Sequence, residues 1–214
     1  DEWLVHAASM ELSGDAPYAY RIPLMVKQVE NLWGEMPDTL ERFVLASQLS
    51  QAEAVKYFIE RFRYGKWRRT GIIWWNLLDG WPQFSDAVVD YYFRKKAAFD
   101  FIKRSQLPVC LMMTEPQDGK MKLVAANEYP FDVEFAYKVT DLTDGAAAVS
   151  GAARVEALSA KEIGEIAYDP QKAHFYRIQW RLDGKEYQNH FLSGTPPFRL
   201  DEYVGWMRQC GLLE

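Results

Sequence analysis

The first third of the chain carries apolar residues at helical spacing. Between residues 18 and 33 they recur every three or four positions, which predicts a helix that ends at Gly34. A second helix is predicted over residues 38–62, because an apolar stripe there lies opposite a face of Glu, Gln and Lys residues. The stripe comprises Leu40, Phe43, Val44, Val55, Phe58, Ile59 and Phe62.

A short apolar run follows this second helix. Residues 71–76, GIIWWN, are apolar on both alternating faces, which predicts a strand buried on both sides in a parallel sheet. A turn-rich loop with Gly80 and Pro82 comes next, and residues 87–104 are predicted to form a helix entry and a helix. The inward side of that helix is assigned to Ala97, Ala98, Phe101 and Ile102. Helix, buried strand, long loop and helix is the order found in a (β/α)8 barrel.

The spacing of apolar positions falls to two after Leu107-Pro108. Short strands separated by turn signals such as Asp183-Gly184-Lys185 predict an immunoglobulin-like antiparallel β-sandwich, and residues 200–213 predict a short terminal helix. The candidate strands are residues 109–113, 120–126, 133–141, 163–168, 175–182 and 187–192. The predicted fold is therefore α+β: residues 1–106 form the final part of a (β/α)8 barrel, and residues 107–214 form the sandwich with its helix.

Composition and charge narrow the classes of function. Hydrophobic residues make up 49% and aromatic residues 15%, which argues for a packed core and against disorder. The net charge of −5 argues against nucleic acid as a partner, and no apolar stretch approaches the ~20 residues that cross a membrane. Two cysteines do not make a disulfide framework, and His6, His174 and His190 have no metal-site spacing. No cofactor is expected, and the compartment stays open.

Candidate chemistry lies where the predicted strand 71–76 ends. Trp75 and Asn76 sit at that end, and Asp79 and Trp81 begin the following loop. In a (β/α)8 barrel this is the face that carries the active site. An indole stacks on the apolar face of a sugar ring while an amide and a carboxylate bond its hydroxyls, so these four residues are candidate substrate-binding residues. The alternative is plain packing, because a tryptophan-rich strand is more often core.

The same segment resembles a known family. GIIWWNLLDGWP, residues 71–82, is similar to the eighth-strand signature of β-mannosidase-type enzymes of glycoside hydrolase family 2. The resemblance extends over about residues 40–105. It also includes Ser47-Gln48, Gln51-Ala52, Ile59-Glu60 and Arg63 upstream, and Val89-Asp90-Tyr91-Tyr92 and Lys96-Ala97 downstream.

The resemblance implies roles for particular positions. Trp75 matches the strand-eight tryptophan that lines the sugar site, Asn76 matches a position usually held by glutamine, and Asp79 matches the aspartate after it. Leu78 departs from the pattern, since asparagine is typical there. The resemblance favours β-mannoside-like substrates, and the departure at Leu78 leaves a related β-linked glycoside as the other possibility.

The resemblance also implies a catalytic pair that this chain lacks. Family members are retaining glycosidases, which need two carboxyl groups about 5–5.5 Å apart. Their glutamates lie near the ends of the fourth and seventh strands, in contexts that do not occur before residue 40; Glu11 has neighbours that do not match. A barrel takes roughly 250 residues. We therefore expect no catalytic residue here, a pair upstream of Asp1, an inactive isolated chain, and the remainder of the parent barrel as a partner.

A different class of function stays open at this point. The sandwich is an alternative candidate for a carbohydrate-binding or purely structural module without catalysis. Its platform would be formed by Tyr129, Phe131 or Tyr187. Core or turn packing is the competing interpretation for these rings, because most strand aromatics face inward.

Overall fold

The computed structural model describes His6 and residues 20–213. The fold is α+β with antiparallel sheets, and the chain divides into two compact units. The first comprises Asp1–Lys56, Ile73–Ile102 and Pro196–Leu200, and the second comprises Tyr57–Ile72, Lys103–Thr195 and Asp201–Glu214. The boundary expected between residues 106 and 107 stays a prediction.

The helices expected in the first third are present. Helix α2 spans Arg21–Trp33 and α3 spans Leu40–Tyr64; the start expected at residue 18 lies outside the described residues. Gly34 ends α2 at φ +92°, and its N–H donates to the carbonyl of Glu30 at 2.8 Å. Only glycine takes this left-handed conformation without strain, so the predicted stop is confirmed. The Trp33 indole N–H then donates to the carbonyl of Ala46 and ties α2 to α3.

The apolar stripe expected along α3 is only partly correct. Phe43 and Ile59 are buried, but Leu40, Val44 and Phe58 are exposed. Small and medium residues on the neighbouring face are buried instead, namely Ala46, Leu49 and Ala52. The reason is the close approach of Trp33 to the turn of α3 that contains Ala46, which selects that face for burial.

Residues 71–76 do not form the strand that the sequence predicts. The structure assigns no strand there, and Ile73 is 95% exposed. A strand needs a ladder of backbone hydrogen bonds from a neighbour, whereas this segment is followed by isolated bridges such as the parallel one between Leu78 and Val89. The described residues therefore do not show the expected strand, and its place in a (β/α)8 barrel stays a prediction.

The helix expected over residues 87–104 is shorter than predicted. Helix α4 covers only Ala97–Ser105, and residues 87–96 are irregular. The carboxylate of Asp90 accepts hydrogen bonds from the backbone N–H groups of Tyr92 and Arg94. This local bonding competes with helical hydrogen bonding and turns the chain instead.

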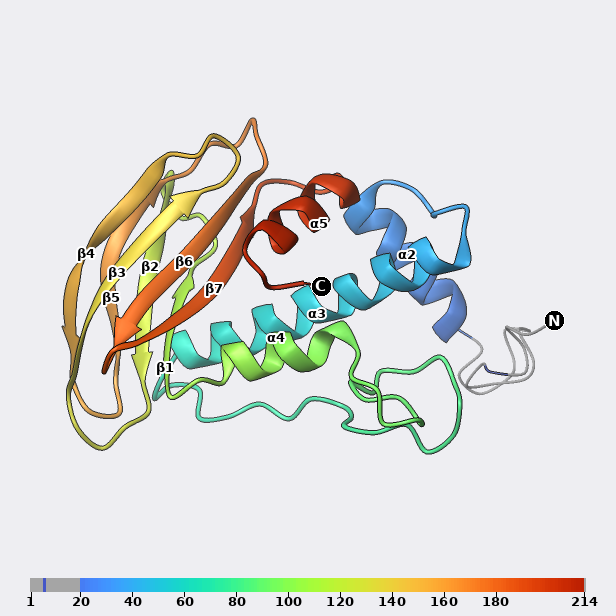
Figure 1. Cartoon of the computed structure of the whole chain (residues 1–214), viewed down its shortest axis with the longest axis horizontal. Helices are drawn as coiled ribbons and strands as arrows, with labels where there is room; N and C mark the ends of the chain where they lie inside the picture. The colour runs from blue at the N-terminus through green and yellow to red at the C-terminus, as the bar shows by residue number, and fades with distance from the viewer. Residues whose placement is uncertain (1–5, 7–19, 214) are drawn as a thin grey trace. The chain divides into compact units, whose positions relative to one another are not determined.

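The second unit contains two antiparallel sheets (Figure 1). One has the order β1-β2-β5, with β1 at Val109–Met113, β2 at Lys120–Asn127 and β5 at Ala160–Ala167. The other has the order β4-β3-β6-β7, with β4 at Ala147–Val155, β3 at Val133–Asp141, β6 at His174–Leu182 and β7 at Lys185–Ser193. Residues from both sheets share one core that includes Leu123, Val139, Ile178 and Trp180. The antiparallel sheets predicted from the period of two are confirmed.

Strand β4 is absent from the sequence prediction. Its sequence, AAVSGAARV, is rich in residues with low strand propensity, and most of it is not buried. Its pairing with β3 provides the register, because Gly151 lies opposite Tyr137. A Cβ at Gly151 would lie 3.1 Å from the Tyr137 hydroxyl, whose proton is donated to the carbonyl of Ile163. Glycine therefore gives the tyrosine ring room over the edge strand.

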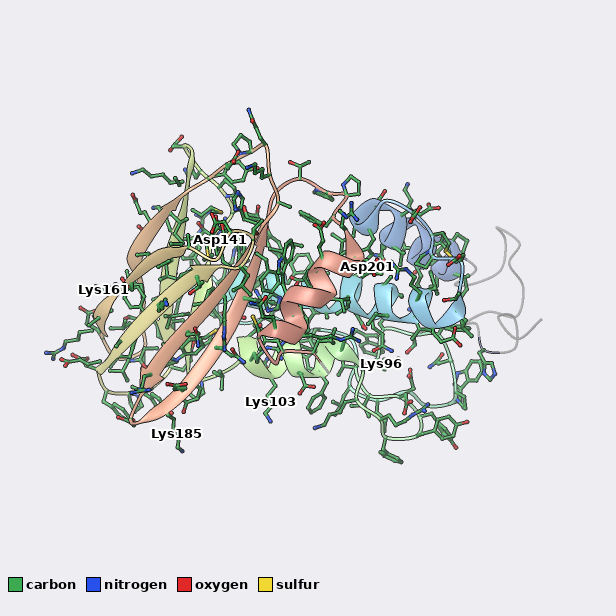
Figure 2. All side chains as sticks on the ribbon, turned by 45° about the horizontal axis from the view of Figure 1, so that its top comes forward. Lys96, Lys103, Asp141, Lys161, Lys185 and Asp201 are labelled. Carbon is green, nitrogen blue, oxygen red and sulfur yellow. The ribbon has the colours of Figure 1, made fainter. Side chains whose placement is uncertain are left out.

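Helix α5, Leu200–Gln209, covers one side of the second sheet. Phe175 on β6 stacks against Trp206 and meets Tyr203 edge-on. Lys161 on β5 and Lys185 on β7 extend outward from the two sheets (Figure 2). Across the described part of the chain, no helix combines the length and apolarity that a membrane crossing needs.

A buried polar network also holds the second unit together. The Asn189 side-chain amide donates to a carboxylate oxygen of Glu60 at 2.7 Å and to the carbonyl of Leu111 at 2.9 Å. The Ser105 hydroxyl donates to the same Glu60 oxygen at 3.3 Å. These contacts join the end of α3 to β7 and β1 within this unit, and they provide Glu60 with the donors that a buried carboxylate needs.

Candidate functional site

Two tryptophan rings are open to solvent around the loop that follows residue 76. The Trp75 side chain is 74% exposed, and Trp81 is also exposed. Asn76 lies between them in the sequence, and its side-chain oxygen is buried and accepts no hydrogen bond from the described residues. A sugar ring can stack its apolar face on an exposed indole, and one of its hydroxyls can donate a hydrogen bond to a free acceptor such as this oxygen.

Asp79 is placed differently, in the interior of the loop. Only 3% of the residue is exposed, and one carboxylate oxygen lies 2.9 Å from the ammonium of Lys96. The other oxygen accepts hydrogen bonds from the Ser85 hydroxyl and from the Gln83 amide. Its contact with a sugar stays a prediction, since the interactions in the structure are internal to the loop.

Backbone hydrogen bonds complete the frame of this loop. The N–H of Val88 donates to the carbonyl of Asn76 at 3.1 Å, and the N–H of Val89 donates to the carbonyl of Leu77 at 2.9 Å. The N–H groups of Asp79 and Lys96 donate to the carbonyls of Val89 and Val88, respectively. The two ends of the loop are thus joined around the Asp79–Lys96 ion pair.

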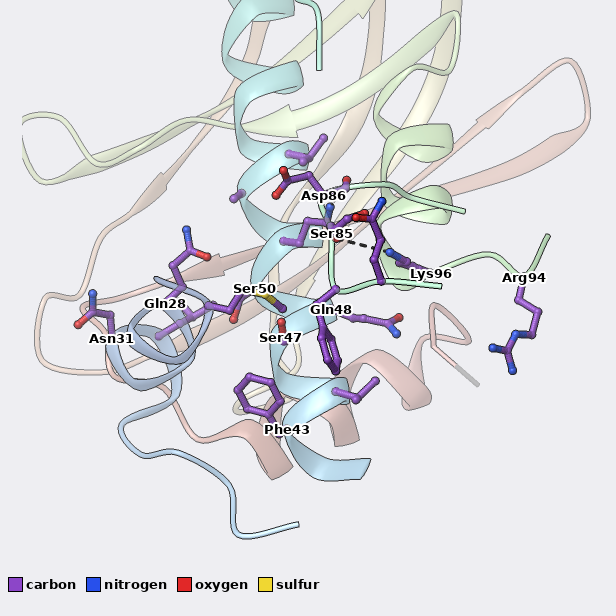
Figure 3. A pocket seen from close by; sticks show the side chains of 18 of the residues that line it. Gln28, Asn31, Phe43, Ser47, Gln48, Ser50, Ser85, Asp86, Arg94 and Lys96 are labelled. Carbon is purple, nitrogen blue, oxygen red and sulfur yellow. Dashed lines mark hydrogen bonds between the residues drawn. The ribbon is translucent and has the colours of Figure 1, made fainter. Parts of the chain in front are cut away.

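A cavity of about 630 Å³ lies in the first unit, beside this loop (Figure 3). Gln28 and Asn31 approach it from α2, and Ser47 and Gln48 approach it from α3. The Gln48 side chain accepts the N–H of Ala97 at 3.0 Å, while Gln51 donates to the carbonyl of Asp86 at 2.5 Å. These amides brace the loop against α3 from one wall of the cavity.

A tight turn forms the far end of the loop. The N–H of Asp90 donates to the carbonyl of Arg94, and the N–H of Phe93 donates to the carbonyl of Asp90. Beside the turn lies a hollow of about 180 Å³, whose wall includes Asp79, Gln83, Tyr91, Tyr92 and Arg94.

The Asp90 carboxyl should titrate below its ordinary range. Partial burial raises its pKa, but hydrogen bonds from the backbone and guanidinium of Arg94, together with the Tyr92 N–H, outweigh that effect and leave the pKa lowered. A lowered folded pKa means that this carboxylate stabilises the turn above about pH 4 and loses that effect as the pH falls through the folded pKa. We expect the NMR titration midpoint of its carboxyl carbon to lie below the value of about 3.9 for Asp in an unfolded peptide, whereas a midpoint at or above that value would contradict the turn geometry.

The sandwich presents fewer open rings than the alternative function requires. Tyr187 stacks on Trp180 with ring centroids 5.7 Å apart, and Tyr129 is partly buried against the core. Phe131 is exposed and stacks on Tyr129 at 4.9 Å. Of the three rings considered from the sequence, Phe131 alone is open enough for a ligand to stack on it.

Several residues that shape the loop were missed by sequence reasoning. From the sequence, Lys96 enters only through the family resemblance, yet in the structure Lys96 and Ser85 both hold Asp79. Gln48 and Gln51 also enter only through the resemblance, yet their side chains form hydrogen bonds with the loop and the start of α4. The one available signal was an Asp and a Lys that flank a loop rich in turn residues, which is too common a pattern to predict an ion pair.

Comparisons with known proteins identify relatives of this chain. No protein-family model matches it. A segment of 96 residues is 36% identical to β-mannosidase B of Thermothelomyces thermophilus, covering 40% of this chain and 10% of that enzyme. The matched segment is therefore about a tenth of the fungal enzyme's length.

Solved structures show the same fold. A β-D-mannosidase from Dictyoglomus thermophilum superposes with a TM-score of 0.72 at 23% identity, covering 85% of this chain and 23% of that one. An exo-β-D-glucosaminidase superposes with a TM-score of 0.62 at 22% identity, covering 79% and 21%. The sequence match to the fungal β-mannosidases and the fold shared with these solved structures support the resemblance of this chain to β-mannosidase-type enzymes of glycoside hydrolase family 2.

Proposed function

We propose that this chain supplies part of the sugar-binding rim of a retaining β-glycosidase, with β-mannoside-like substrates favoured. In this proposal Trp75, Asn76 and Trp81 contact the sugar, and Asp79 holds the loop that presents them. The names of the fungal relatives and of the Dictyoglomus structure support the substrate class.

The observation that carries the proposal is the exposed row of apolar side chains around Trp75. Ile73, Trp75 and Leu77 are all exposed and alternate with less exposed residues along an extended segment. Large apolar side chains gathered at a protein surface mark a binding surface. We propose that residues 71–76 pair with the remaining strands of a (β/α)8 barrel in the whole protein, and that Trp75 then lies at the mouth of that barrel.

Asn76 supports the same assignment from its polar side. Its buried side-chain oxygen has no donor among the described residues, and buried acceptors are normally satisfied. A sugar hydroxyl beside the Trp75 ring is a suitable donor. The leucine at position 78 removes an amide from this rim, so the preferred glycoside makes fewer polar contacts there.

The catalytic carboxyl pair belongs elsewhere in the whole protein under this proposal. The two carboxylates that line the hollow, Asp79 and Asp90, are each paired with a cation, Lys96 and Arg94. A retaining glycosidase needs two carboxyl groups that are free to act on the glycosidic bond, whereas these two are held in ion pairs within the loop. The segment matched in the fungal enzyme is 10% of its length, which leaves ample chain for the pair.

The decisive test replaces Trp75 in the full-length protein. Trp75→Ala removes the stacking surface, and we expect kcat/KM on an aryl β-mannoside to fall about 100-fold, the loss of a large transition-state contact. Steady-state kinetics with the purified enzyme measure this fall.

A matched variant separates stacking from general damage. Trp67 is comparably exposed, but its ring meets the Lys66 ammonium and the proposal gives it no sugar contact, so Trp67→Ala should leave kcat/KM unchanged. Equal activity of the Trp75 variant and the unsubstituted enzyme would sink the proposed role. Measurable hydrolysis of an aryl β-glycoside by the 214-residue chain alone would contradict the absence of the catalytic pair.

A further inference from the structure

Three consecutive aromatic residues are exposed at the turn after Asp90. Tyr91, Tyr92 and Phe93 form this aromatic tip, and Phe93 is 77% exposed. The rings of Tyr91 and Tyr92 meet edge-on with centroids 5.4 Å apart, and the Arg94 guanidinium lies 5.3 Å from the centre of the Tyr92 ring. The exposed face of each of these rings can stack on the apolar face of a ligand.

The aromatic tip is held rigidly from below. One oxygen of Asp90 accepts the N–H groups of Tyr92 and Arg94, each at 2.9 Å, and the other accepts the Arg94 side chain at 2.7 Å. Two backbone hydrogen bonds between Asp90 and the residues at the other side of the turn close it. A fixed platform loses little conformational entropy when a ligand binds.

Phe93 occupies a backbone conformation that disfavours its own side chain. Its φ of +63° lies in the left-handed region, where glycine is unstrained and a bulky residue is an outlier. Strained residues of this sort cluster at sites where the side chain is used. The strain therefore argues that the ring of Phe93 has a purpose that outweighs its conformational cost.

The hollow beside the aromatic tip has the chemistry of a sugar site. Tyr91 and Tyr92 supply rings, while Gln83 and Arg94 supply polar groups. Its volume of about 180 Å³ is below the 300–1,000 Å³ or so of pockets for drug-sized ligands, which suits a single ring. Asp79 also lines it, so the hollow adjoins the loop that presents Trp81.

We propose that the aromatic tip binds the leaving-group sugar of an oligosaccharide, next to the residue that is cleaved off. This inference rests on the proposed glycosidase function and adds to it the side chains that hold the sugar next to the cleaved one. The leaving-group sugar stacks on the tip, and its hydroxyls bond Gln83 and Arg94.

The test compares two substrates in the full-length enzyme. β-1,4-Mannobiose has a leaving-group sugar, whereas β-D-mannosyl fluoride has only a fluoride ion there. Phe93→Gly removes a ring and suits the left-handed backbone, so the turn is kept; Tyr92→Ala removes the neighbouring ring. For both variants we expect the ratio of kcat/KM on mannobiose to that on mannosyl fluoride to fall about tenfold, as expected for a lost stacking contact.

Each outcome decides the proposal. A ratio that stays unchanged in both variants overturns it, including the case in which both substrates are slowed equally because the rings serve packing alone. Trp67→Ala removes an exposed ring to which the proposal gives no sugar contact, so it is the matched control and should not move the ratio. If the unsubstituted enzyme cleaves neither substrate, the proposed glycosidase function is wrong. If it cleaves both and the substitutions do not change the ratio of kcat/KM values, only the proposed role of the aromatic tip is wrong.

Discussion

Asp79→Ala should destabilise the first unit by about 3–5 kcal/mol, the usual cost of removing one partner from a buried ion pair. Asp79 is almost fully buried and the Lys96 side chain is 14% exposed, so the substitution leaves an ammonium ion in the loop interior without its counter-charge. The N–H groups of Val88, Val89 and Lys96 should then exchange faster with solvent. Urea unfolding and amide hydrogen exchange of the 214-residue chain measure both effects.

The same loop provides a control for this prediction. Asp86 also forms an ion pair, with Arg21 at 3.2 Å, but its side chain is 57% exposed. Exposed pairs contribute about 0–1 kcal/mol, so Asp86→Ala should change little. Adding Lys96→Met to Asp79→Ala should recover part of the loss, because it removes the stranded charge. Asp79→Ala and Asp86→Ala variants of equal stability would refute the structural role of the Asp79–Lys96 pair.

Trp180→Ala should cost about 3–5 kcal/mol of unfolding free energy, in the range measured for deletion of a large ring from a core. Trp180 is 2% exposed, stacks on Tyr187 and lies opposite Tyr137 in the pairing of β3 with β6. Its removal opens a cavity between the two sheets, which the surrounding strands cannot fill. Urea unfolding followed by near-ultraviolet circular dichroism reports the loss.

Trp67→Ala is the comparison for the core substitution. Its ring is exposed, and the Lys66 ammonium lies 5.2 Å from its centre, so at most about 1 kcal/mol is lost with it. If Trp180→Ala proves as mild as Trp67→Ala, the sheets do not pack as the structure has them.

The sequence predicts an element correctly where the spacing of its apolar residues matches the positions that are buried in the structure. Strand β3 alternates between buried and more exposed positions along its whole length, and Gly34 ends α2 as its position implies. Strand β4 is not predicted, because its sequence is rich in Ala, Ser and Gly, which have low strand propensity. Residues 71–76 mislead for another reason: apolar composition predicts burial but does not say which chain segment provides the cover.

The candidate site shows the same limit. Trp75 and Trp81 were singled out from residue type and place, and both rings are exposed. The Asp79–Lys96 pair depends on the path of the intervening loop, and the aromatic tip depends on the turn that Asp90 closes. Neither follows a helical or strand period, so residue spacing gives no signal for them.

The composition of β4 matters for how copies of the protein behave in solution. As the outer strand of its sheet, β4 offers unpaired backbone groups along one side, the usual starting point for strand-to-strand aggregation. Its short side chains offer an incoming strand little apolar surface to bury, and Arg154 adds charge at the end of β4. The weak strand propensity that conceals β4 in the sequence therefore also keeps neighbouring molecules from adhering at that edge.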